Sequence, residues 1–455
     1  MVSDNNQTNM DDTARSVFFI TLGCAKNEVD TASMKRRVLA AGYALTEDAE
    51  EADAVVVNTC SFIQAATEES IDTILEVCSL PSVECGDSKL IVAGCMPARY
   101  GDDLEPEFPE AQAFVACSRE DDIAQILDGL FEGSSHGVES EGFDSSYGCC
   151  KSSDEGLQLE MPAAYVKISD GCDRFCSFCM IPYIRGRYHS FEFEDICREV
   201  ASRIDEGARE ITLIAQDTGR WGEDLVPPQT TASLISRLAE RFPDTWFRIM
   251  YLEPEGVTDE LLEVIASHAN VCNYLDIPLQ HCSGRIIKAM NRKGDAAQFQ
   301  DMVDRIRRRI PDITLRTTLI AGFPGETDED VESLEDFLDA VQFDYAGVFA
   351  FSPEDGTRAA LLSDQVDEDT RNERAQRLRD FCDSVSFSRV AEREGQEMDV
   401  LVLGREEDGQ LFGRAQCQAP EVDGVVYLES GEPGEIVRVR ISDTLAYEME
   451  GEIVG

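Results

Sequence analysis

The sequence predicts an α/β protein with three folded parts: an open parallel α/β sheet domain, a central partial (β/α) barrel and a small C-terminal antiparallel β-barrel. Short continuous apolar segments alternate with amphipathic segments through most of the chain, which is typical of βαβ units and parallel sheets. Near the C-terminus the pattern changes to short strands separated by Gly, Asp, Glu and Pro turns, which predicts a small barrel. The chain has 455 residues, 43% of them hydrophobic, so it can bury several cores.

The first α/β part is expected at residues 16–132. Residues 1–15 are polar and acidic and are expected to form a disordered leader, whereas the Ser-, Gly- and acid-rich stretch at 133–157 is expected to be a linker. Apolar runs predict strands at residues 17–22, 54–58 and 90–93. The amphipathic segments between them predict helices at residues 27–41 and 65–78.

The second part, at residues 158–394, is expected to be the partial barrel. Six apolar runs predict its strands, at residues 165–168, 210–215, 246–251, 274–277, 314–320 and 345–351. Helical segments separate the strands, for example at 193–206 and 328–341, and a charged helix follows at 364–394. Six β/α repeats are fewer than a complete (β/α) barrel contains. The third part, at residues 395–455, carries predicted strands at 398–403, 411–416, 425–428 and 436–441.

Charge and targeting signals exclude several classes of function. Asp and Glu number 90 against 40 Lys and Arg, a net charge of −50, so broad electrostatic binding of nucleic acid is not favoured and a basic protein partner is. There is no uninterrupted apolar stretch of membrane-spanning length, and residues 1–15 contain no hydrophobic signal core. We therefore expect a cytoplasmic protein that does not cross a membrane.

Sixteen cysteines and only four histidines indicate thiolate-based metal chemistry. The strongest motif is Cys172, Cys176 and Cys179, spaced C-x3-C-x2-C in a loop after the first predicted barrel strand. Three thiolates can hold three irons of a 4Fe–4S cluster and leave the fourth iron open. A structural zinc site is the alternative, but zinc sites favour paired C-x2-C units with a fourth ligand, and no fourth ligand lies nearby in the sequence.

A second set of cysteines is dispersed. Cys24, Cys60 and Cys95 each come directly after a predicted strand of the first part. The carboxyl ends of parallel strands share one edge of a sheet, so the three thiols can converge there, helped by the small neighbours Gly23, Thr59 and Gly94. The alternative is that they are three buried structural cysteines.

The sequence resembles the radical S-adenosylmethionine (SAM) methylthiotransferase family over nearly its whole length. The resemblance is carried by residues 22–27 (LGCAKN), 58–62 (NTCSF) and 93–95 (AGC), by the three-cysteine loop, and by a terminal barrel similar to a TRAM domain. It implies that Cys24, Cys60 and Cys95 ligate an auxiliary 4Fe–4S cluster. It also implies that Cys172, Cys176 and Cys179 ligate the cluster that cleaves SAM.

Four further stretches resemble the RimO branch of that family, which modifies ribosomal protein S-twelve. They are residues 166–172 (VKISDGC), 216–218 (QDT), 274–281 (YLDIPLQH) and 315–326 (LRTTLIAGFPGE). Ala25 and Cys282 depart from the branch pattern, but neither is an expected ligand. The resemblance implies methylthiolation of the β-carbon of an aspartate with two SAM molecules, and an electron donor such as flavodoxin or ferredoxin.

Charge gives an independent argument for a protein substrate. Residues 395–455 contain fourteen acidic residues and four arginines but no lysine, a net charge of −10. A barrel that grips tRNA needs basic residues, whereas an acidic one complements a ribosomal protein. The alternative is that every protein of the source organism is acidic, which would make this charge uninformative.

Polar residues at the predicted strand ends are candidates for holding SAM. They are Gln216, Asp217, Gln280, Arg316, Gly322 and Glu326. Each can equally be a turn or core-edge residue. Arg174, Arg185, Arg187 and His189 form a basic patch beside the cysteine loop, which either faces a ligand or is salt-bridged.

Three functions remain open on the sequence. They are a ribosomal-protein methylthiotransferase, a tRNA methylthiotransferase that forms 2-methylthio-adenosine, and a non-catalytic iron–sulfur or zinc scaffold. No G-x-G-x-x-G follows the first predicted strand, which argues against dinucleotide binding. The isolated cysteines are expected to be buried small residues, and Cys149 and Cys150 lie in the predicted linker.

Overall fold

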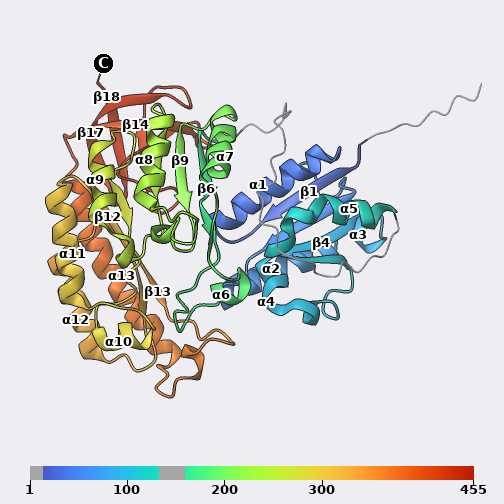
Figure 1. The fold of residues 1–455 in the computed structure, drawn as a ribbon, viewed down its shortest axis with the longest axis horizontal. Coiled ribbons are helices and arrows are strands. Elements are labelled where there is room, and N and C mark those ends of the chain that lie inside the picture. The colour runs from blue at the N-terminus through green and yellow to red at the C-terminus, as the bar shows by residue number, and fades with distance from the viewer. Residues whose placement is uncertain (1–13, 133–158, 455) are drawn as a thin grey trace, which may run out of the picture. The chain divides into compact units, whose positions relative to one another are not determined.

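The computed structural model describes residues 14–132 and 159–454, and each of these two ranges forms a compact unit (Figure 1). Residues 1–13 of the expected leader, the expected linker and its Cys149 and Cys150 lie outside the described residues. In the part of the chain that is described, no helix is both long and apolar enough to cross a membrane.

The first unit is a five-stranded parallel sheet in the order β2-β1-β3-β4-β5, with helices on both faces. Its strands are β1 (Ser16–Thr21), β2 (Ala44–Leu45), β3 (Ala54–Thr59), β4 (Lys89–Gly94) and β5 (Ala111–Ala116). Its helices are α1 (Ala25–Ala40), α2 (Gln64–Cys78), α3 (Pro81–Glu84), α4 (Cys95–Tyr100) and α5 (Ile123–Glu132). β2 lies on one side of β1 in the sheet, whereas β3, β4 and β5 are added on the other side. The order of strand addition therefore switches sides between β1 and β3. Ligands bind at such a reversal in open α/β sheets.

The three strands predicted for this unit are confirmed as β1, β3 and β4. The apolar runs of β3 and β4 were good predictors because these strands are buried between two helix layers. The short edge strands β2 and β5 were not predicted from the sequence. β5 (AQAFVA) is half exposed at the edge of the sheet and lacks a continuous apolar run.

The second unit begins with a partial barrel of six parallel strands. They are β6 (Ala163–Lys167), β9 (Glu210–Ile214), β10 (Trp246–Ile249), β11 (Tyr274–Asp276), β12 (Thr314–Ala321) and β13 (Tyr345–Ala350). They form the sheets β10-β9-β6 and β11-β12-β13, which a bridge between Phe247 and Val271 connects. The prediction of six strands is therefore confirmed.

Helices on the outside cover the barrel (Figure 1). They are α7 (Phe193–Asp205), α8 (Thr231–Arg241), α9 (Asp259–Ser267), α11 (Ala296–Arg309), α12 (Asp328–Val341) and the long α13 (Glu368–Ala391), with the short α6 (Ile181–Ile184) and α10 (Gly284–Ala289) in loops. Two residue pairs form capping boxes that fix helix starts, Thr230 with Ser233 for α8 and Thr327 with Asp330 for α12.

The C-terminal part is a closed barrel in the order β14-β15-β16-β18-β17. Its strands are β14 (Glu397–Arg405), β15 (Leu411–Ala415), β16 (Val426–Leu428), β17 (Ile436–Leu445) and β18 (Glu448–Ile453). All neighbouring pairs are antiparallel except β16 and β18, which pair parallel. β18 (EMEGEI) was not predicted, because half of its residues are acidic and only one face packs inward.

A buried charge network joins the closed barrel to the base of the partial barrel. The Glu210 carboxylate at the start of β9 has no exposed surface and accepts hydrogen bonds from Arg248 at 2.7 Å and Arg414 at 2.8 Å. Burial alone would raise the pKa of Glu210, but the Arg414 and Arg248 guanidiniums outweigh it and hold that pKa below its usual value. Nearby, the Tyr274 hydroxyl donates to Asp423, and Arg316 lies 3.5 Å from the same carboxylate. Burial raises the pKa of Asp423 to about 6.

We expect Arg414→Ala to destabilise the second unit by about 3 kcal/mol, because it leaves the buried Glu210 carboxylate with one guanidinium instead of two. Arg438→Ala is the matched control, since Arg438 pairs with Asp399 at the exposed surface and its loss costs less than about 1 kcal/mol. Urea unfolding followed by tryptophan fluorescence measures both, because the two tryptophans, Trp221 and Trp246, lie in this unit. Equal losses in the two variants would contradict a stabilising role for the network.

Candidate functional site

The first candidate centre is the loop of Cys172, Cys176 and Cys179, between β7 (Ser169–Asp170) and α6. β7 pairs with β8 (His189–Ser190) and closes the loop at its base. Burial, together with the neighbouring Asp217 carboxylate and Cys176 thiol, raises the pKa of Cys172 to about 11. Burial and the thiols of Cys176 and Cys172 likewise raise the pKa of Cys179. The three thiols are therefore close enough to raise one another's pKa, and their ligation of a cluster stays a prediction.

Residues that follow α10 hold this loop in place, although no sequence motif had pointed to them. Ser177 donates its backbone N–H to the Met290 carbonyl at 2.9 Å, and the Asn291 amide donates to the Arg174 and Phe175 carbonyls at 3.2 and 3.0 Å. Arg292 lies 3.9 Å from the Cys176 sulfur. Its guanidinium also pairs with Glu253, so the cation beside the sulfur is fixed in place.

The second candidate centre is the set of Cys24, Cys60 and Cys95. Cys24 caps α1, Cys60 follows β3 and Cys95 begins α4 directly after β4. A hydrogen bond to Cys95, followed by burial, raises the pKa of Cys60, and Cys24 also contributes. The structure thus places Cys60 against Cys95 and within reach of Cys24, whereas the joint ligation of a cluster by the three thiols stays a prediction.

Two glycines allow this convergence. A Cβ on Gly23 would lie 2.8 Å from the Cys60 sulfur, and a Cβ on Gly94 would lie 2.3 Å from Asn58 Oδ1 and 2.6 Å from the Thr59 carbonyl oxygen. Both glycines have positive φ, +96° and +95°. The missing side chains therefore let Cys60 pack closely against Gly23, and Asn58 and Thr59 against Gly94.

The donor chemistry of both sets fits an iron–sulfur cluster. Within residues 14–132 and 159–454, no three His, Cys, Asp or Glu side chains converge closely enough to bind a single metal ion. A 4Fe–4S cluster does not need that convergence, because each thiolate binds a different iron. Three thiols per site, with backbone held open around them, match such a cluster.

Unpartnered polar atoms gather at the strand ends of the partial barrel. Both amide atoms of Gln216, Asp217 Oδ1 and Gln280 Oε1 are shielded from solvent and have no hydrogen-bond partner. Gln280 also adopts the left-handed conformation, with φ of +70°. Buried polar groups are normally paired, so these atoms are candidates for contacts with a polar ligand.

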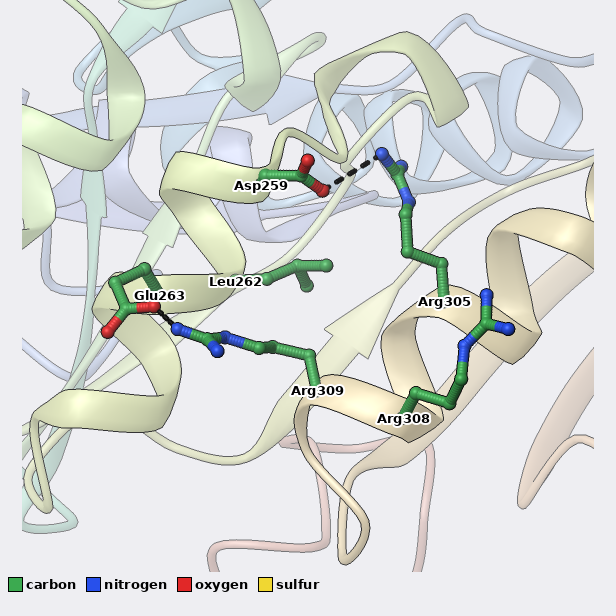
Figure 2. Close-up of a pocket in the computed structure, with 6 residues that line it drawn as sticks. All are labelled: Asp259, Leu262, Glu263, Arg305, Arg308 and Arg309. Atoms are coloured by element: carbon green, nitrogen blue, oxygen red, sulfur yellow. Dashed lines mark hydrogen bonds and ion pairs between the residues drawn. The ribbon is translucent and has the colours of Figure 1, made fainter.

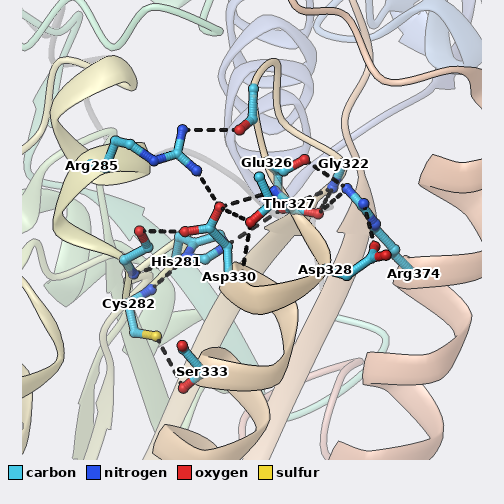
Figure 3. Close-up of polar contacts among 12 residues, drawn as sticks. His281, Cys282, Arg285, Gly322, Glu326, Thr327, Asp328, Asp330, Ser333 and Arg374 are labelled. Carbon is cyan, nitrogen blue, oxygen red and sulfur yellow. Dashed lines mark hydrogen bonds and ion pairs between the residues drawn. The ribbon is translucent and has the colours of Figure 1, made fainter.

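Gly322 and Glu326 lie in one turn, which hydrogen bonds between these two residues stabilise (Figure 3). Both Glu326 carboxylate oxygens accept the Gly322 N–H, at 2.9 and 3.0 Å, and one accepts from Arg374 at 3.1 Å. His281 Nε2 lies 3.5 Å from the same carboxylate, and His281 Nδ1 accepts the N–H groups of Cys282 and Ser283. Glu326 thus joins the turn after β12 to the loop after β11.

Arg316 and the basic patch are already paired within the protein. Arg316 lies 3.1 Å from Asp276 and belongs to the network at the barrel base. Arg174 pairs with Asp217 at 2.6 Å, Arg185 with Asp170, and Arg187 with Asp173. The salt-bridged interpretation of the patch arginines is therefore the one that the structure supports.

Two surface grooves lie apart from these centres. One, of about 390 Å³, lies between α9 and α11, where Arg305 pairs with Asp259 and Arg309 with Glu263 (Figure 2). The other, of about 880 Å³, crosses the closed barrel. Its acidic lining is Glu406, Glu407, Asp408, Glu429, Glu450 and Glu452.

Known protein families match three segments of the chain, and curated relatives match nearly all of it. Residues 16–116 match the uncharacterized protein family UPF0004, residues 166–338 the radical SAM superfamily and residues 395–454 the TRAM domain. A protein of Natranaerobius thermophilus named ribosomal protein uS12 methylthiotransferase RimO is 40% identical, covering 96% of this chain and 98% of that protein. A protein of the same name from Geobacter sulfurreducens is 42% identical, covering 98% and 100%.

Solved structures share the fold. The radical SAM methyltransferase TsrM from Kitasatospora setae, solved with cobalamin and a 4Fe–4S cluster, superposes with a TM-score of 0.55 at 15% identity, covering 76% of this chain and 77% of TsrM. The cobalamin-dependent radical enzyme OxsB superposes with a TM-score of 0.51 at 13% identity, covering 82% and 56%. At such low identity the likeness shows the architecture alone.

We expect Gly94→Ala to abolish iron binding by the first unit, because its Cβ would meet backbone and side-chain atoms that hold Cys60 in place. Gly42→Ala is the matched control, since Gly42 has φ of +93° but nothing within 4 Å of the added Cβ, so it costs only the roughly 1 kcal/mol of backbone strain. Iron bound after anaerobic reconstitution is measured in both variants. The steric argument is wrong if both bind as much iron as the parent protein.

Proposed function

The chain belongs to the RimO family of ribosomal protein uS12 methylthiotransferases, and from this we propose that it methylthiolates the β-carbon of an aspartate in uS12, the S-twelve protein of the small ribosomal subunit. The observation that carries the proposal is the pair of three-cysteine sets, one after the strands of each parallel-strand system. One centre accounts for SAM cleavage and the other for sulfur transfer, so a single-cluster function leaves one of them without a role.

When bound, a cluster on Cys172, Cys176 and Cys179 would supply the electron that cleaves SAM, and one on Cys24, Cys60 and Cys95 would supply the methylthio group. The protein's own part is to position these groups and exclude water. The positively charged guanidinium of Arg292 lies beside Cys176, and its ion pair with Glu253 fixes its position. Burial raises the pKa of Cys176, and the Arg292 guanidinium opposes that rise.

We propose that Gln216, Asp217 and Gln280 hold the polar groups of SAM, since each has shielded atoms without a partner. The Glu326 carboxylate already accepts hydrogen bonds from the Gly322 N–H and from Arg374. We therefore propose that Gly322 and Glu326 keep the turn beside the SAM site rigid and do not contact SAM themselves. Arg316 pairs with Asp276 and Asp423, so we assign it to the charge network at the barrel base and not to SAM binding.

The acidic groove on the closed barrel supports a basic protein as substrate. Carboxylates line a groove of about 880 Å³ on this barrel, where tRNA phosphates would be repelled. Ribosomal proteins are basic, so the groove complements them in charge.

A ribosomal protein as substrate also implies a cytoplasmic enzyme, which is reduced by a donor such as flavodoxin or ferredoxin. We propose that the parts act as domains at residues 16–132, 158–394 and 395–455.

We expect anaerobically reconstituted protein to add a methylthio group to an aspartate of uS12 in small subunits supplied with SAM, dithionite and sulfide. Cys24→Ala and Cys172→Ala should lose the product, because each removes one thiolate of a different centre. Cys382→Ala is the control, since Cys382 is a buried cysteine of α13 outside both centres. Mass spectrometry of peptides and of nucleosides from added tRNA is the measurement. Methylthio-adenosine with unmodified uS12 would move the enzyme to the tRNA-modifying branch.

The groove makes a separate prediction. We expect the double variant Glu406→Lys/Glu450→Lys to raise the KM for uS12 about 10-fold with little change in kcat, because it weakens complementary charge away from the reacting atoms. Glu105→Lys/Glu107→Lys carries the same change in net charge on the exposed surface of the first unit and should leave KM unchanged. An equal rise in KM for both variants would show that only net charge matters.

A further inference from the structure

We propose that Asn27 is a positioning residue of the auxiliary centre, whose one side chain ties together the three loops that carry Cys24, Cys60 and Cys95. The inference rests on the proposed function, because it assumes that these thiols hold a cluster. Asn27 lies in the first turn of α1 and has no exposed surface. It reaches all three loops from that position.

The contacts of the side chain are specific. Asn27 Nδ2 donates to the Leu22 carbonyl at 2.9 Å and to the Thr59 carbonyl at 2.9 Å. The first carbonyl lies two residues before Cys24 and the second lies directly before Cys60. Since both N–H groups of the amide face carbonyls, Oδ1 is the atom that faces Cys95, whose sulfur lies 3.8 Å away.

The backbone of Asn27 is fixed as well. Its N–H donates to the Cys24 carbonyl at 2.7 Å, and its carbonyl accepts from the Asn58 amide at 3.0 Å. Asn58 also donates to Thr31 on the next turn of α1, at 2.9 Å. The amide plane therefore has one orientation, and a shift of one cysteine loop would break bonds to the others.

No other side chain of this size can make the same set of contacts. An aspartate has the same shape but only acceptors, so it would oppose two carbonyl oxygens and place a negative charge beside three thiolates. An alanine would leave both carbonyls unsatisfied. Partners that hold metal ligands in place typically change metal affinity by about 10- to 100-fold when they are lost.

The test uses the full chain with Cys172, Cys176 and Cys179 replaced by Ala, so that bound iron reports on the auxiliary centre alone. In that background we expect Asn27→Ala and Asn27→Asp to lose iron to a chelator at a concentration about 10-fold lower than the parent does. Asn27→Asp should also alter the EPR spectrum of the reduced centre and lower its midpoint potential, because it adds negative charge beside the sulfur. The added charge acts on the potential whatever role Asn27 has, so the loss of chelator resistance, and not the potential, tests the positioning role.

Asn270 provides the matched control. Its amide donates to three backbone carbonyls, of Ala239, Phe242 and Thr245, at 3.1, 3.1 and 3.2 Å, but it lies in the second unit. Asn270→Ala and Asn270→Asp should leave iron retention and the EPR spectrum of the centre unchanged. If Asn27→Ala does not fold, Asn27→Asp decides.

The possible failures are distinguishable. A parent that binds no iron overturns the proposed cluster and the inference together. A parent with four irons per chain whose Asn27 variants match it in chelator resistance and EPR spectrum overturns the inference alone. Asn27 variants that change no more than the Asn270 variants overturn it as well.

Discussion

The structure depends on one constraint of parallel sheets, namely that the carboxyl ends of all strands meet at one edge. Cysteines that are about 35 residues apart in the sequence come together in the first unit for this reason alone. In the second unit the same constraint gathers the cysteine loop after β6 and the unpartnered polar atoms of Gln216 and Gln280. A chemical centre can therefore be built from short segments, each fixed by its own strand.

The sequence was a good guide where a feature is local or continuously apolar. Buried strands such as β3, and the position of each cysteine after a strand, followed from apolar runs alone. Edge strand β5 and acidic strand β18 were missed because their pairing depends on neighbours distant in the chain. Arg292 lacked a signal for the same reason, since its role comes from contacts across loops. Asn27 belongs to the motif at residues 22–27, but its contact with the loop of Cys60 comes from the fold. The pairing of Arg316 with carboxylates of two other segments could not be read from its own strand.

Charge is used differently on the surface and in the interior. With 90 acidic and 40 basic residues, every arginine has acidic neighbours available. The structure assigns Arg174, Arg248 and Arg292 to shielded carboxylates, where a pair is screened least by salt. The acids left over face solvent, and in the groove of the closed barrel they create a continuous negative field. Several of the remaining acids thus gather along one groove of the closed barrel.

The network of Glu210, Arg248 and Arg414 also limits how this architecture can evolve. The closed barrel resembles an exchangeable module, because it is contiguous in sequence and completes its own hydrogen-bonded ring. Yet Arg414 and Asp423 reach out of that ring into the floor of the catalytic barrel. A lineage that acquired a foreign module to change its substrate would have to bring matching groups at those two positions, or rebuild the floor at the same time. Substrate choice and core stability are inherited together.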